Sequence, residues 1–123
     1  MSLAYGNLIG PAEGPFSVPS LDVWNRPHGK TSTVVFYQDE NKITVTLSLT
    51  ARIEDIGVDE IEILTFERNT SVHRNARRRE IIKVDSGYLT PNTSYQHSVD
   101  MANEAYHNLM NSGYRITKSE INW

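Results

Sequence analysis

Residues 43–53, with the sequence ITVTLSLTARI, decide the fold of this chain. Apolar and polar side chains alternate without a break through the segment. One face carries Ile43, Val45, Leu47, Leu49, Ala51 and Ile53, and the other carries Thr44, Thr46, Ser48, Thr50 and Arg52. A period of two is that of a β-strand with one buried face. We therefore predict a strand whose polar face lies in solvent or is covered by the N-terminal segment or a second subunit.

The segments around this strand have the composition of further strands. Residues 32–38 (STVVFYQ) precede it, and the polar turn 39–42 separates the two. Residues 60–72 (EIEILTFERNTSV) and 77–89 (RRREIIKVDSGYL) follow, and both contain β-branched and aromatic residues that favour strands. We predict that these two form a long hairpin with a basic tip at 73–76. Shorter strands joined by an irregular basic loop are the alternative.

Residues 90–113 carry the signals of one helix. Thr90 can cap its start, Pro91 suits the first helical position, and Gly113 suits the left-handed position past its end. Apolar residues recur at helical spacing and form one stripe, which consists of Tyr95, Val99, Ala102, Tyr106 and Leu109. This stripe would cover the apolar face of the sheet. Residues 114–123 alternate weakly and predict a short last strand.

This order of elements predicts an α+β domain. Its mainly antiparallel sheet has four to five strands, and one C-terminal helix packs across one face. A chain of 123 residues has the usual size of one domain. We place that domain at 32–123, after an extended N-terminal arm at 1–31. The arm holds four of the five prolines, so we expect neither a helix nor a central strand in it.

The arm is too apolar for a solvated linker, since it contains Phe16, Val18, Leu21, Val23 and Trp24. It can pack on the sheet of its own chain or on a neighbouring subunit. The second arrangement makes Phe16 and Trp24, together with Trp123 at the other end of the chain, candidate oligomer contacts.

The composition excludes several classes of protein. The chain contains no cysteine, which rules out disulfides, thiolate nucleophiles and cysteine-ligated metals. No stretch approaches the roughly 18 to 20 apolar residues of a membrane helix, and the first residues lack the pattern of a secretory signal. We therefore predict a soluble cytoplasmic protein that binds no cofactor.

Charge is distributed unevenly along the chain. The net charge of −3 argues against a protein that coats nucleic acid. Residues 39–62 nevertheless contain seven acidic and two basic side chains, whereas residues 68–79 contain five arginines and no acid. Such opposed stretches can steer a partner or pair one subunit with another.

A basic cluster is the main candidate binding site, and it comprises Arg68, His73, Arg74, Arg77, Arg78 and Arg79. Guanidinium groups match the geometry of phosphate and carboxylate. Strand alternation would place Arg78 on the opposite side from Arg77 and Arg79, which favours contact at a loop tip over a broad platform for duplex DNA. The cluster could also be a solvated tip, paired with nearby carboxylates or with the acidic stretch 54–62. Helix-turn-helix, zinc-finger and P-loop patterns are absent.

The polar face of the predicted helix is a weaker candidate. His97, Asp100, Glu104 and His107 follow at spacings of three, four and three. Two neighbours in such a series can share a metal ion, but four ligands along three turns cannot reach the same ion. A solvated polar face explains the pattern equally well. We assign no metal ligand and no catalytic residue, because no local signature marks a nucleophile.

These observations favour a non-enzymatic binding or assembly protein. We predict that it acts as a homo-oligomer and that its basic hairpin tip contacts an anionic partner. One alternative is a protein that binds a phosphate ligand or nucleic acid through the arginines of 74–79. A metal-dependent or acid–base enzyme with its site on the polar helix face is the other.

Overall fold

The computed structural model describes residues 13–24, 29–72, 79–86 and 91–123. Its elements in chain order are α1 (Leu21–Trp24), β1 (Lys30–Gln38), β2 (Ile43–Ile56), β3 (Asp59–Val72), β4 (Arg79–Ser86), α2 (Pro91–Met110) and β5 (Arg115–Glu120). Two predicted features, the cap at Thr90 and the basic tip at 73–76, lie outside the described residues.

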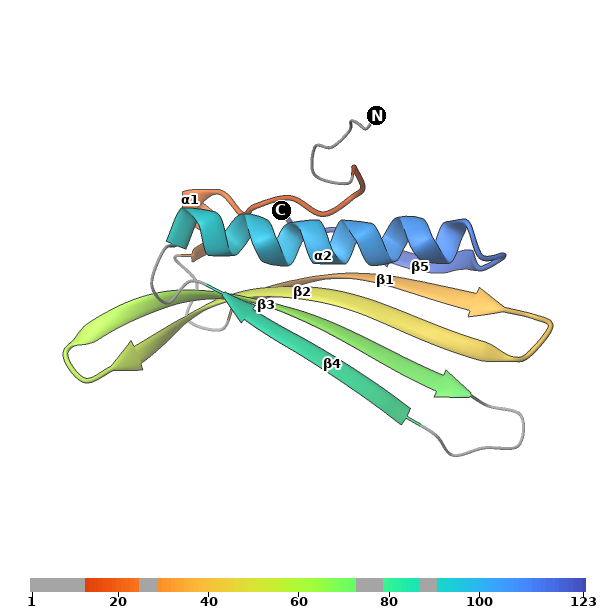
Figure 1. Cartoon of the computed structure of the whole chain (residues 1–123). Helices are drawn as coiled ribbons and strands as arrows, with labels where there is room; N and C mark the ends of the chain where they lie inside the picture. Colours follow the sequence, from red (N-terminus) through yellow and green to blue (C-terminus); the bar gives the residue numbers. More distant parts are fainter. Residues whose placement is uncertain (1–12, 25–28, 73–78, 87–90) are drawn as a thin grey trace, which may run out of the picture.

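The strands form one antiparallel sheet in the order β4-β3-β2-β1-β5. Helix α2 packs across one face of this sheet (Figure 1). The predicted α+β class, with a mainly antiparallel sheet and one helix after the strands, is confirmed. Strand β5 follows α2 in the chain but returns to pair with β1 at the edge of the sheet.

The alternating residues of β2 build the centre of the core. Val45, Leu47, Leu49 and Ala51 are each at most 1% exposed. Their register partners include Val34 and Phe36 of β1 and Phe66 of β3, which are buried on the same face. Above them lies the predicted apolar stripe of α2, where Tyr106 meets Phe36 edge to face at a ring distance of 5.5 Å.

The end of α2 follows the predicted pattern. Gly113 has a φ of 86°, a backbone conformation that glycine adopts without steric cost. The Tyr114 N–H donates to the Leu109 carbonyl at 3.2 Å, which is the six-to-one hydrogen bond of a Schellman motif. This turn directs the chain back toward β1.

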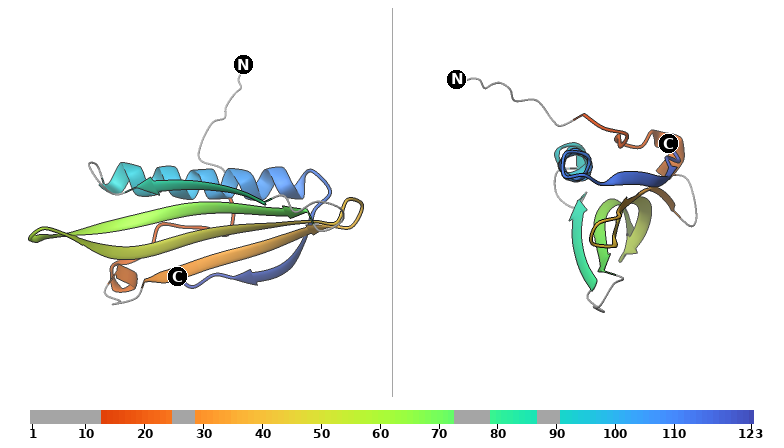
Figure 2. Two further views of the ribbon diagram at one scale, coloured as in Figure 1. Left: turned by 90° about the horizontal axis from the view of Figure 1, so that it is seen from below. Right: turned by 90° about the vertical axis from the view of Figure 1, so that its right-hand side faces the viewer.

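The N-terminal residues differ from the prediction in one respect. Residues 21–24 form the single helical turn α1, where we expected no helix. The Val23 N–H donates to the Ser20 carbonyl at 3.1 Å, and the turn buries Val23 and Trp24 to 5% and 4% exposure. Burial of these two side chains outweighs the weak helical propensity of the segment. Figure 2 shows α1 and residues 13–20 on the same side of the sheet as α2.

The polar face of β2 is therefore not covered by the described part of the N-terminal segment. Thr44, Thr46, Ser48 and Thr50 are half-buried on this face, and the Thr50 hydroxyl lies 2.9 Å from that of Thr31. The arm, one of the three environments that we considered for this face, is excluded for residues 13–24.

Candidate interaction surfaces

Strands β2 and β3 extend beyond the rest of the sheet. Pairing of β1 with β2 ends at Lys30 and Ala51, and pairing of β4 with β3 ends at Ser86 and Leu64. Pairing of β2 with β3 continues to Ile56 and Asp59. Residues 52–63, which we call the acidic ribbon, thus form a two-stranded projection at one end of the molecule (left in Figure 1).

The tip of the acidic ribbon is a two-residue turn made by Gly57 and Val58. Gly57 has a φ of 65° and Val58 does not have a positive φ, which is the pattern of a type II′ hairpin turn. The side chain of Val58 is 100% exposed. An apolar side chain is thus presented at the outermost point of the ribbon.

The ribbon carries five carboxylates and one guanidinium, a net charge of −4. Arg52 donates to Glu54 at 2.7 Å, and Glu62 accepts a hydrogen bond from Tyr95 at 2.8 Å. Asp55 and Glu60 are exposed and have no hydrogen-bond or ion-pair partner within the described residues. The ribbon therefore presents uncompensated negative charge beside Val58.

Tyr95 fixes the base of the ribbon to α2. Its side chain is 6% exposed, and its ring stacks on Trp24 at a centroid distance of 5.1 Å. Burial, followed by the hydrogen bond to Glu62, raises the pKa of the Tyr95 hydroxyl above its ordinary value. Sequence patterns placed Tyr95 in the apolar stripe but gave no sign of its polar contact with Glu62.

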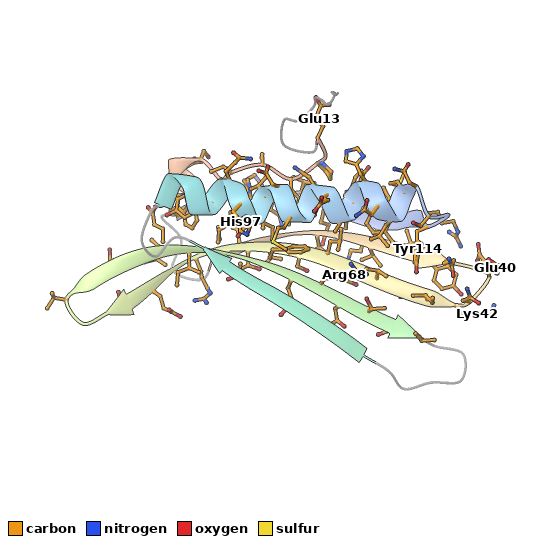
Figure 3. All side chains as sticks on the ribbon, in the orientation of Figure 1. Glu13, Glu40, Lys42, Arg68, His97 and Tyr114 are labelled. Carbon is orange, nitrogen blue, oxygen red and sulfur yellow. The ribbon has the colours of Figure 1, made fainter. Side chains whose placement is uncertain are left out.

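Only two members of the predicted basic cluster, Arg68 and Arg79, lie within the described residues, so the cluster stays a prediction. Residues His73, Arg74, Arg77 and Arg78 lie outside the described part of the chain, and Arg79 begins β4 opposite Ser71. Arg68 pairs with Leu47, so it belongs to the face of the sheet that α2 covers (Figure 3). The Nε of Arg68 is buried and has no hydrogen-bond partner in the described residues.

The acidic ribbon and Val72 lie at opposite ends of β3. The ribbon contains the first residues of this strand, and Val72 is its last residue, next to Ser71, which pairs with Arg79 of β4. Fourteen residues of extended strand span roughly 40 Å. The ribbon is therefore far from Val72 within one chain. The basic residues 73–78 that follow Val72 in the sequence lie outside the described residues.

The polar face of α2 does not assemble a metal site. His97, Glu104 and His107 are exposed, and Gln96 donates to Asp100 at 2.8 Å. Among the described residues, no group of three or more histidine, cysteine, aspartate or glutamate side chains could hold a metal ion. We do not pursue the metal-dependent alternative.

The three aromatic residues predicted to contact another subunit are packed within the chain. Phe16 and Trp24 are each 4% exposed, and Trp123 packs partly buried against the core. The prediction that these residues contact another subunit stays a prediction, since the structure contains a single chain.

Residues 13–19 run beside α2, to which the hydrogen bonds of Phe16 attach them. Beside them is an open groove of about 620 Å³, lined by Glu13, Gly14, Phe16, Ser17, Val18, Gln96, Val99, Asp100 and Asn103. Asn103 is 4% exposed, and its side-chain amide holds the backbone of Phe16. The sequence did not mark Val58 or Asn103 as a candidate interaction residue. The only signal for Val58 was that a single valine stands in an acidic turn, and Asn103 had no signal.

No protein-family model, curated protein or solved structure matches this chain. In the part of the chain that the structure describes, no helix is both long and apolar enough to cross a membrane. The function must therefore be argued from the surfaces themselves.

Proposed function

We propose that this protein is a non-enzymatic assembly protein that forms homo-oligomers. In this assembly the acidic ribbon of one copy contacts the basic 73–79 segment of another. The ribbon is thereby the anionic partner of the basic segment. The observation that carries the proposal is the fully exposed Val58, flanked by unpaired Asp55 and Glu60, on a projection about one strand length away from Val72, which directly precedes the basic segment in the sequence.

The properties of the ribbon support this role. A type II′ turn needs glycine at its first central position. At the other positions, turns that lie in solvent favour polar residues. Val58 contributes nothing to the packing of its own chain, because its side chain is fully exposed. Beside it, carboxylates without a partner attract a cationic surface and repel a second ribbon. The ribbon therefore selects the basic end of another copy.

Two arrangements satisfy this contact. A head-to-tail contact generates a ring or an open filament, whereas a two-fold dimer lets each ribbon reach the basic segment of the other copy. Both arrangements bury Val58 and pair the same charges. The molar mass in solution distinguishes them.

The test is light scattering coupled to gel filtration at tens of micromolar protein and low salt. We expect wild type to have at least the mass of a dimer and D55K/E60K to be a monomer. The matched control is E40K/E104K, which reverses two exposed carboxylates outside the ribbon and changes the net charge equally. Retention of the oligomer by this control supports the proposal. A monomeric wild type, or equal loss of mass in both variants, overturns it.

Binding of a phosphate-bearing ligand or nucleic acid by residues 74–79 is the second candidate. It is favoured by the four arginines that residues 74–79 contain, with no acidic residue among them. Anisotropy titrations with labelled oligonucleotides would then show an affinity that falls with salt at a slope of about three or four phosphate contacts. Replacing Arg74, Arg77, Arg78 and Arg79 with serine should abolish this binding. D55K/E60K should retain it, which separates the two functions.

A further inference from the structure

Residues 13–19 are bound to α2 through their main chain. The Phe16 N–H donates to the Asn103 Oδ1 at 3.1 Å, and the Asn103 Nδ2 donates to the Phe16 carbonyl at 3.0 Å. The Trp123 Nε1 donates to the Ser17 carbonyl at 2.7 Å. Each contact joins a side chain of the folded domain to a backbone group of the segment. This is how a protein holds an extended peptide.

The side chains of residues 13–19 show at which positions the docking surface requires a particular type of residue. A Cβ atom at Gly14 would clash with the side-chain amide of Asn103, so glycine is the residue that fits there without displacing this amide. Phe16 and Pro19 are buried, whereas Ser17 and Val18 are exposed. The surface therefore recognises glycine, an aromatic residue and proline in the pattern Gly-x-Phe-x-x-Pro. The intervening positions are free to vary.

We propose that Asn103 and Trp123 form a docking surface for this pattern and that, in the assembled protein, it holds residues 13–19 of a second copy. Exchange of the segment keeps the same contacts in the new chain, which makes it a low-cost route to a dimer. Residues 13–20 belong to none of the strands, so exchange of the segment breaks no strand pairing. Phe16 then becomes a contact between subunits, whereas Trp24 stays packed on Tyr95 of its own chain.

This inference rests on the proposed self-assembly but uses a surface other than the acidic ribbon. Docking within one chain competes with docking between chains, and a higher protein concentration favours the second. Exchange therefore grows with concentration, whereas a segment that always docks in its own chain shows no such growth.

The experiment exploits the absence of cysteine from the chain. A donor chain carries S17C and an acceptor chain carries Q96C, because Ser17 and Gln96 line the same groove. The two full-length chains are mixed at high concentration and treated with a short bis-maleimide. We expect a covalent heterodimer. An acceptor with N108C, farther along α2 and also exposed, is the matched control and should give at least tenfold less heterodimer.

The test is specific because Asn103 should be required in the acceptor chain and not in the donor chain. N103A in the acceptor chain should reduce the heterodimer at least fivefold, because the docking amide is then missing. The same substitution in the donor chain should leave the yield unchanged or raise it. Circular dichroism of each variant confirms that it is folded, and W123F in the acceptor provides a second, milder loss of one hydrogen bond.

Two outcomes overturn the inference. One is the absence of heterodimer while an S17C/Q96C double variant is cross-linked within one chain. The other is a heterodimer that responds equally to N103A in either chain. Both leave the ribbon proposal standing if wild type remains oligomeric by light scattering. Cross-linking that persists in a D55K/E60K background shows that segment exchange does not depend on the ribbon.

Discussion

At the scale of single residues, Asn103 connects parts of the chain that are 87 positions apart. It lies in a helix, where asparagine has a modest propensity, and it is almost fully buried. Burial of a primary amide is costly unless its donors and acceptors are paired. The backbone N–H and carbonyl of Phe16 pair with the Asn103 amide, so one side chain satisfies the hydrogen-bonding needs of two backbone groups.

We expect N103A to lower the free energy of unfolding by about 2 to 4 kcal/mol, because it leaves two backbone groups of Phe16 unpaired in a buried position. Urea denaturation followed by circular dichroism measures this change. The matched control N108A removes an exposed asparagine from the same helix and should alter stability by less than about 0.5 kcal/mol. Equal effects of the two substitutions would contradict the role assigned to Asn103.

At the scale of elements, Tyr95 joins α2, α1 and the acidic ribbon. Its ring packs against Trp24 and its hydroxyl donates to Glu62, so one side chain fixes the position of three elements. The hydroxyl can donate only while it carries its proton. The pKa of Tyr95 is raised in the folded protein by burial and by the hydrogen bond to Glu62.

This raised pKa predicts a loss of stability in alkali. Above a pH of about 10.0, the ordinary tyrosine pKa, the unfolded chain releases the Tyr95 proton and the folded chain retains it. The unfolded state then binds fewer protons, so the free energy of unfolding falls as the pH rises. We expect Y95F to flatten this fall between about pH 9 and 11 and to be about 1 to 2 kcal/mol less stable near pH 7.

Chemical denaturation at a series of pH values measures both effects. Other tyrosines titrate in the same range, so the quantity to compare is the difference between wild type and Y95F. Y114F is a suitable control, because Tyr114 is only half-buried and its hydroxyl has no hydrogen-bond partner among the described residues. A constant difference between wild type and Y95F across this range would refute the assignment.

At the scale of the whole molecule, the long hairpin of β2 and β3 concentrates negative charge at one end of the protein. The acidic ribbon projects at one end of β3, and Val72, after which the arginines follow in the sequence, ends the strand at the other. The net charge of −3 does not reveal that the ribbon alone accounts for −4. In the assembly that we propose, charge directs the association between copies and burial of Val58 completes it.

Directed association of this kind should weaken with salt. We expect the association constant to fall about tenfold or more between roughly 50 mM and 500 mM sodium chloride, because screening shortens the reach of exposed charges to a few ångströms. Sedimentation equilibrium measures this change. Association that strengthens with salt would show that apolar contact dominates and would contradict the role of Asp55 and Glu60.

Local patterns in the sequence determined much of the fold. The alternation of 43–53, the apolar stripe of α2 and the glycine at 113 all survive in the structure. Each is set by the geometry of a few consecutive residues, so it can be read without knowledge of the rest of the chain. The order of strands and helix then restricted the architecture to one helix on an antiparallel sheet.

Only the tertiary structure decided which surfaces are free. It buried Phe16 and Trp24 within the chain, left Val58 fully exposed, and paired Asn103 with a segment near the other end of the sequence. It also placed the acidic ribbon and Val72 at opposite ends of β3. These facts depend on register and on contacts between distant residues, which no local pattern encodes. The sequence by itself determined the elements, whereas packing determined what they present to a partner.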